Sequence, residues 1–149
     1  MKDEINNYTR SIIWKIHLGS GPEKAFSFLT TNEGRTKFWA ESSLEKDGII
    51  HFVFPDGTKY DSKVLKVKKA KEYKLVYFGG SEVTFNITPD GDGGCDLTLK
   101  ATKVNPKYYC EERAGWISVL MSMKAAADFG IDLRNHDTKR RWNNGYCDN

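Results

Sequence analysis

The sequence predicts an α+β fold, in which a curved antiparallel sheet of about seven strands wraps around one long C-terminal helix. The first observation is that β-branched and aromatic segments recur about every ten residues, separated by turn signals such as Pro55-Asp56-Gly57. The second is that apolar residues recur at helical spacing in the stretch after Pro106. Short strands joined by tight turns are typical of antiparallel sheets, because parallel strands need long crossover connections.

The pattern begins with one strand and two short helices. Residues 9–18 are β-branched and aromatic, which predicts a strand. Pro22 suits the first turn of a helix, so we expect a helix over residues 22–29. The segment that follows predicts a second short, irregular helix, broken at Gly34 and ending near Trp39.

The following strands alternate apolar and polar residues, which places their apolar side chains on one face of the sheet. Turns are expected at Asp47-Gly48 and at Gly79-Gly80. The predicted groups on shared faces are Ile50, Phe52 and Phe54; Val83, Phe85 and Ile87; and Cys95, Leu97 and Leu99.

The long helix is predicted over residues 107–129, with Gly130 as its C-cap. Its apolar stripe consists of Tyr109, Trp116, Leu120, Met123 and Ala127. Relative to that stripe, Glu111, Glu112 and Asp128 are expected to point mostly outward. An inward acidic residue for acid–base catalysis is therefore not predicted.

Gly115 lies in the middle of this helix beside Trp116. Glycine in a helix interior costs about 1 kcal/mol relative to alanine, so its presence needs a reason. One explanation is a close crossing by another element, and the other is a cavity that leaves space for a ligand. The sequence does not separate the two, and we favour close packing.

The 149 residues, of which 39% are hydrophobic, predict a single domain over 1–149. We expect a core over about residues 9–130 and an irregular, packed tail over 131–149. Three distant cysteines indicate reduced thiols rather than disulfides. No signal peptide is expected, and no apolar run approaches the roughly 20 residues of a membrane span. A cytoplasmic protein without membrane insertion is therefore predicted.

Charge and polar motifs exclude several classes of function. The net charge of +3 is modest, and the lysines of residues 59–74 alternate with aliphatic residues as on a half-buried strand, so no nucleic-acid binding is expected. His17, His51 and His136 are scattered, which argues against a metal site. An antiparallel sheet lacks the βαβ unit of dinucleotide sites, so no cofactor is expected. No catalytic residue is predicted, because no nucleophile and base pair is recognisable.

Several motifs occur in an order that resembles a known family. They are "PEKAFSFLT" after the first strand, "FW" at 38–39, "FPDGTKY" at 54–60, "YKLVYF", "EVTFNITPDGDGGCDLTL", and the spacing of Gly115, Trp116, Leu120 and Met123. From about Ile12 to Ala127 the chain resembles the SRPBCC superfamily (START-like, helix-grip fold). Within it, the chain is similar to the AHSA-like group, named after the C-terminal domain of the activator of the heat-shock chaperone ATPase. The tail resembles those of bacterial, Bacteroidetes-like members.

The resemblance implies a deep cavity between the long helix and the sheet, which different members use for lipids, polyketides or other apolar molecules. The polar groups expected there are Tyr60, Tyr77, Arg113 and Lys124. The remaining expected lining residues are Trp39, Phe52, Phe54, Phe85, Leu99, Trp116, Leu120 and Met123. Aromatic residues at such spacings are also typical of an ordinary core, which is the alternative interpretation.

The function predicted on this basis is non-catalytic binding of a small apolar or aromatic molecule by a monomer or weak dimer. One alternative is a protein-interaction module, a co-chaperone or stress-response protein that exposes the basic hairpin of residues 59–74. The eukaryotic co-chaperone of this group also has an N-terminal docking domain. We do not expect that domain here, since the chain starts shortly before the shared fold. The other alternative is a cyclase- or dehydratase-like enzyme that uses the same cavity.

Overall fold

The computed structural model describes residues 10–149, so Thr9 of the predicted first strand lies outside the described residues. The strands are β1 (Arg10–Leu18), β2 (Ser42–Lys46), β3 (Ile49–Val53), β4 (Lys59–Lys68), β5 (Glu72–Tyr77), β6 (Ser81–Pro89) and β7 (Cys95–Val104). The helices are α1 (Pro22–Thr30), α2 (Asn32–Thr36) and α3 (Tyr109–Phe129). Short 3-10 turns are η1 (Phe78–Gly80), η2 (Pro106–Tyr108) and η3 (Trp142–Asn144).

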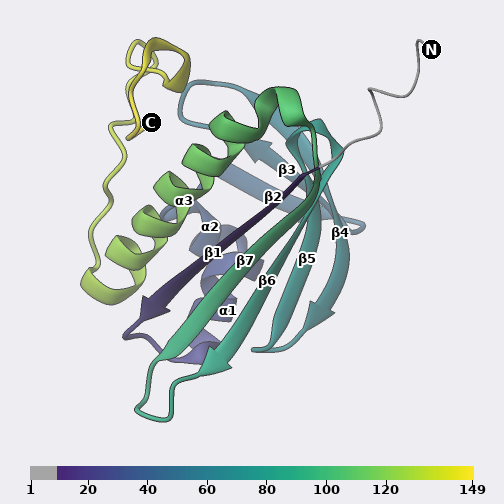
Figure 1. The fold of residues 1–149 in the computed structure, drawn as a ribbon. Helices are drawn as coiled ribbons and strands as arrows, with labels where there is room; N and C mark the ends of the chain where they lie inside the picture. Colours follow the sequence, from purple (N-terminus) through teal and green to yellow (C-terminus); the bar gives the residue numbers. More distant parts are fainter. Residues whose placement is uncertain (1–9) are drawn as a thin grey trace, which may run out of the picture.

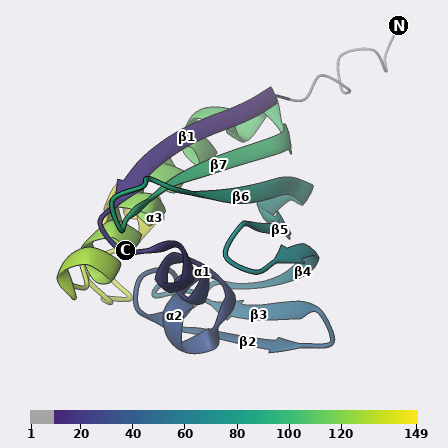
Figure 2. The ribbon, with the colours of Figure 1, turned by 90° about the horizontal axis from the view of Figure 1, so that it is seen from below.

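The seven strands form one antiparallel sheet in the order β1-β7-β6-β5-β4-β3-β2. The sheet is strongly curved, with α3 lying across the β1 and β7 end, α2 against β2, and α1 against α2 and strands β5 and β6 (Figures 1 and 2). The predicted fold class, a curved antiparallel sheet wrapped around a long C-terminal helix, is confirmed. In the part of the chain described, no helix is both long and apolar enough to cross a membrane.

The core lies between the concave face of the sheet and α3. The predicted alternation in β3, β6 and β7 is confirmed except at Phe54, which lies just after the end of β3 and is partly buried. The inward residues Ile50, Phe52, Val83, Phe85, Ile87, Cys95, Leu97 and Leu99 are at most 5% exposed. On α3 the buried residues include Trp116, Leu120 and Met123, which belong to the predicted apolar stripe. Gly130 ends the helix in the left-handed conformation, as the sequence predicts.

Gly34 does not break the second helix, as the sequence analysis expected, because α2 continues through it. A Cβ atom at Gly34 would lie 2.5 Å from both the Cα of Phe28 and the carbonyl oxygen of Ser27. The predicted break was wrong for a packing reason. This glycine permits α2 to fold back against the backbone of α1, and the side chain of Thr31 caps the turn by accepting a hydrogen bond from the Gly34 amide at 2.9 Å.

Gly115 has the opposite environment. A Cβ atom built there would meet no heavy atom within 4 Å beyond its own helix backbone and chain neighbours. The close-packing interpretation of this glycine was therefore wrong. The helix passes an open space at this point.

The tail after α3 is mostly exposed and is attached to the domain at a few points. The guanidinium of Arg134 donates hydrogen bonds to the carbonyl oxygens of Thr36 and Ala40, at 2.6 and 3.0 Å. The hydroxyl of Ser118 on α3 donates to the carbonyl oxygen of Cys147 at 2.6 Å. These contacts return the end of the chain to the N-terminal half of α3 (Figure 1).

The two glycines predict opposite responses to alanine. Gly115→Ala should stabilise the protein by about 0.5–1 kcal/mol, because alanine favours the helix and its methyl group enters open space. Gly34→Ala should destabilise it by about 1–3 kcal/mol, because its methyl group would overlap backbone atoms of α1. Urea unfolding of both variants measures the difference. A loss of stability in Gly115→Ala, or unchanged stability in Gly34→Ala, would contradict this account.

Candidate functional site

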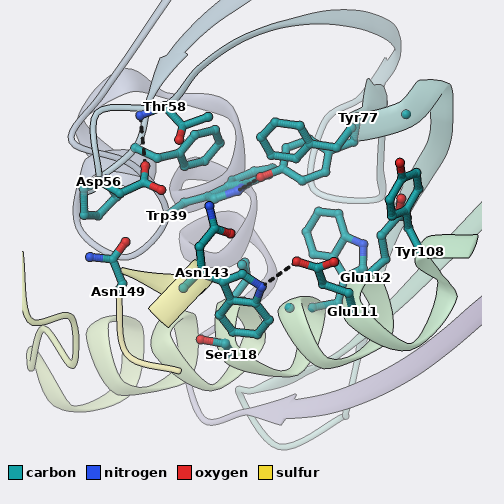
Figure 3. A pocket seen from close by; sticks show the side chains of 18 residues that line it. Trp39, Asp56, Thr58, Tyr77, Tyr108, Glu111, Glu112, Ser118, Asn143 and Asn149 are labelled. Atoms are coloured by element: carbon teal, nitrogen blue, oxygen red, sulfur yellow. Dashed lines mark hydrogen bonds between the residues drawn. The ribbon is translucent and has the colours of Figure 1, made fainter. Parts of the chain in front are cut away.

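A cavity of about 480 Å³ lies beside the N-terminal half of α3 (Figure 3). Its walls come from α3, the β3–β4 turn, the end of β5 with η1, and the C-terminal tail. The lining residues are Trp39, Phe54, Pro55, Asp56, Thr58, Tyr77, Phe78, Gly79, Tyr108, Glu111, Glu112, Gly115, Trp116, Ser118, Val119, Trp142, Asn143 and Asn149.

One wall is a fixed group of aromatic rings around Tyr77. The indole nitrogen of Trp39 donates a hydrogen bond to the Tyr77 hydroxyl at 3.0 Å (Figure 3). The Tyr60 hydroxyl donates to the Tyr77 carbonyl oxygen at 2.7 Å. The ring centroid of Tyr77 lies 5.7 Å from that of Trp39 and 4.8 Å from that of Trp116. These contacts connect the rings into one packed wall of the cavity.

The tyrosines of this wall stay protonated near neutral pH. Burial raises the pKa of the Tyr77 hydroxyl well above its usual value, and burial also raises the pKa of Tyr60. Each hydroxyl therefore remains a neutral hydrogen-bonding group. The aromatic wall contributes no charge to the cavity.

Residues of α3 line the cavity at helical spacing, and they are Glu111, Glu112, Gly115, Trp116, Ser118 and Val119. The absent side chain of Gly115 leaves room between two large neighbours on this face. Glu112 was expected to point outward, and this expectation was wrong. Its position four residues before Trp116 was the signal in the sequence, because residues at this spacing share a helix face.

Glu112 is the unusual ionisable group of the site. Its Oε2 atom is buried and has no hydrogen-bond partner. Burial raises the pKa of the Glu112 carboxyl to about 7, and the charge of Glu111 adds to this effect. A carboxyl that titrates near neutral pH inside a cavity is a typical mark of a functional site.

The C-terminal tail completes the cavity. The Trp142 indole nitrogen donates a hydrogen bond to Oε1 of Glu111 at 3.1 Å, which attaches the tail to the first turn of α3. Trp142, Asn143 and Asn149 all line the cavity. The tail therefore forms part of the wall, a role that no local pattern of its sequence indicated.

The structure brings some of the predicted cavity residues together and places others behind them. Trp39, Phe54, Tyr77 and Trp116 line the cavity. Tyr60 lies behind this wall, against Tyr77. The predicted residues that are buried in the adjoining core are Phe52, Phe85, Leu99, Leu120 and Met123.

Arg113 and Lys124 are placed away from the cavity. The guanidinium of Arg113 lies 4.1 Å from the ring centroid of Trp14 on β1, because one residue beyond Glu112 the helix has turned by about 100°. Lys124 pairs with Asp128 at 3.3 Å near the C-terminal end of α3. We therefore leave both residues out of the proposed ligand site.

The three histidines bind carboxylates in different parts of the structure, and His136 lies between Glu41 and Asp132. His17 contacts Asp90 and His51 contacts Asp61, each at 2.8 Å, in different parts of the sheet. Among residues 10–149 no group of three or more histidine, cysteine, aspartate or glutamate side chains is arranged to hold a metal ion.

A family model for "Activator of Hsp90 ATPase homolog 1-like protein" matches residues 20–128. This span is most of the 149-residue chain, and the chain belongs to this family. The predicted membership of the AHSA-like group is confirmed. A comparison with curated protein sequences finds no match.

Solved structures share the fold at low sequence identity. The Aha1 dimer from Colwellia psychrerythraea is 22% identical, with a TM-score of 0.73 over 81% of this chain and 98% of that one. Protein SSP2350 from Staphylococcus saprophyticus is 18% identical, with a TM-score of 0.74 over 84% and 96%. DynU16, from the dynemicin biosynthetic locus, is 13% identical, with a TM-score of 0.69 over 82% of this chain and 48% of that one. These similarities establish the fold.

The carboxyl of Glu112 predicts a pH dependence of stability. Its pKa rises from an ordinary 4.5 to about 7 on folding, so between these values the folded state binds more protons than the unfolded chain. The free energy of unfolding should therefore fall as the pH rises through this window, and level off above it. With solvent screening of this half-buried group, the loss should amount to about 1–2 kcal/mol.

Glu112→Gln should remove this component. Urea unfolding of wild type and variant from about pH 5 to about pH 8 measures the difference between their free energies. The stability of wild type relative to the variant should decline across the window. A constant difference at all pH values would show that the folded-state pKa of Glu112 is not raised.

Proposed function

We propose that this protein binds a small apolar or aromatic molecule in the cavity beside α3, without transforming it. The observation that carries the proposal is the open space at Gly115, where a helix gives up a side chain next to a packed aromatic wall. Trp39, Phe54, Tyr77 and Trp116 are the proposed contacts for the ligand. A volume of about 480 Å³ lies in the usual range for small-molecule sites.

The driving force would be removal of apolar ligand surface from water, worth about 25 cal/mol per Å². The neutral hydroxyl of Tyr77 and the carboxyl of Glu112 are the polar groups we propose to orient the ligand, since both residues line the cavity. The origin of the structurally similar DynU16 in a biosynthetic locus for a natural product supports a ligand of this class. We propose a cytoplasmic location, which agrees with Cys95, Cys110 and Cys147 all being free thiols.

Two other functions have specific support. Family membership favours a protein-interaction role like that of a chaperone activator. The buried carboxyl of Glu112 favours an enzyme, because a group with a pKa near 7 is suited to general acid–base catalysis. An enzyme would change the mass of a bound molecule with time, and Glu112→Gln would stop that change. A binding protein would release its ligand unaltered.

Gly115→Phe tests the binding proposal directly, because the new ring would occupy the cavity from a helix position that accepts a side chain. Native mass spectrometry of wild type, purified gently from its host, should reveal an extra mass that is lost on denaturation. The variant should lack this mass while keeping its circular dichroism spectrum.

Ala114→Phe is the matched control, because Ala114 is exposed on the same helix and does not line the cavity. It should retain the extra mass. If wild type carries no extra mass, like Gly115→Phe, the result would count against a resident ligand and favour the protein-interaction role.

A further inference from the structure

The charged side chains of the cavity all have the same sign. Asp56, Glu111 and Glu112 line it, and within residues 10–149 no lysine, arginine or histidine does. The whole chain has 23 basic and 20 acidic residues, so the cavity is opposite in sign to the net charge of +3. An anionic ligand would meet unbalanced like charge in this cavity, whereas a cation would be attracted to it.

The three carboxylates differ in what they already bind. An oxygen of Asp56 accepts a hydrogen bond from the Thr58 amide at 2.9 Å, and an oxygen of Glu111 accepts one from the Trp142 indole. Oε2 of Glu112 is buried without a partner. Of the three carboxyl groups that line the cavity, that of Glu112 is therefore the one without a hydrogen-bond donor from residues 10–149, and a cation in the cavity would be attracted to its unbalanced charge.

The walls around Glu112 suit a cation rather than only an apolar group. The aromatic rings that line the cavity are Trp39, Phe54, Tyr77, Phe78, Tyr108, Trp116 and Trp142. The faces of aromatic rings carry negative potential and attract cations, particularly quaternary or alkylated nitrogen. A metal cation would need several converging oxygen or nitrogen ligands, and no such group of side chains occurs in the described part of the chain.

We infer that the ligand is an organic cation, an apolar or aromatic molecule with a positively charged nitrogen that lies against Glu112 and the surrounding aromatic rings. This inference rests on the proposed binding function and narrows it to one chemical class. Glu112 is the counter-ion, and the aromatic wall of Trp39, Tyr77 and Trp116 contacts the apolar part.

Two isosteric probes separate charge from shape. One is (naphthylmethyl)trimethylammonium, which is permanently charged. The other is neopentylnaphthalene, in which carbon replaces the charged nitrogen. Titration calorimetry with the purified protein at about pH 8, where the carboxyl of Glu112 is ionised, should find the cation bound at least about tenfold more tightly than the neutral isostere.

Glu112→Gln keeps the size of the side chain and removes its charge. It should reduce the affinity for the cation about tenfold and leave that for the neutral probe nearly unchanged. Glu33→Gln is the control for net charge, because Glu33 is on α2 with its side chain 86% exposed and does not line the cavity. It should bind both probes like wild type.

The outcomes test the cation preference separately from the proposed ligand-binding function. If both probes bind wild type equally and Glu112→Gln changes neither affinity, the cation preference is wrong while the binding cavity stands. If neither probe binds wild type any better than it binds Gly115→Phe, the binding function itself is overturned. Equal losses in Glu112→Gln and Glu33→Gln would also contradict the inference, because they would indicate an effect of net charge alone.

Discussion

A seven-stranded sheet is wider than one helix can cover, and the rest of this structure follows from that mismatch. Adjacent strands lie about 4.8 Å apart, so a sheet of this size spans about 30 Å, whereas a helix with its side chains is about 10 Å wide. Curvature reduces the gap without closing it. Helix α3 covers the β1 side, α2 packs against β2, and α1 packs against α2, α3 and strands β5 and β6 (Figure 2).

The gap between the sheet and α3 that remains is the cavity, and aromatic residues line it without filling it. Trp39, Tyr77 and Trp116 form a continuous group of rings, in which the indole N–H of Trp39 donates a hydrogen bond to the Tyr77 hydroxyl. Large rigid side chains of this kind bridge a wide gap with few rotatable bonds. They lie between the sheet and the N-terminal half of α3, and the cavity is next to them.

Two residues on the cavity side of α3 lower local stability. Gly115 weakens the helix, and Glu112 buries a carboxyl oxygen without a partner. Both residues lie on the same face of α3 and line the same cavity. Natural sequences depart from locally stabilising choices mainly at functional sites, which is why these two positions support a site better than the aromatic residues alone.

The sequence by itself determined the strand alternation, the span of α3, the fold family and several of the aromatic residues that line the cavity. Each of these depends on local periodicity or on a motif, so it can be read without knowing which elements meet. Only the tertiary structure decided that Gly34 is crowded and Gly115 open, that Glu112 faces the cavity while Arg113 and Lys124 do not, and that the tail supplies Trp142. The physical reason is that a cavity is a gap between distant segments. Its position depends on how the elements pack against one another, and the sequence of a single segment does not determine that packing.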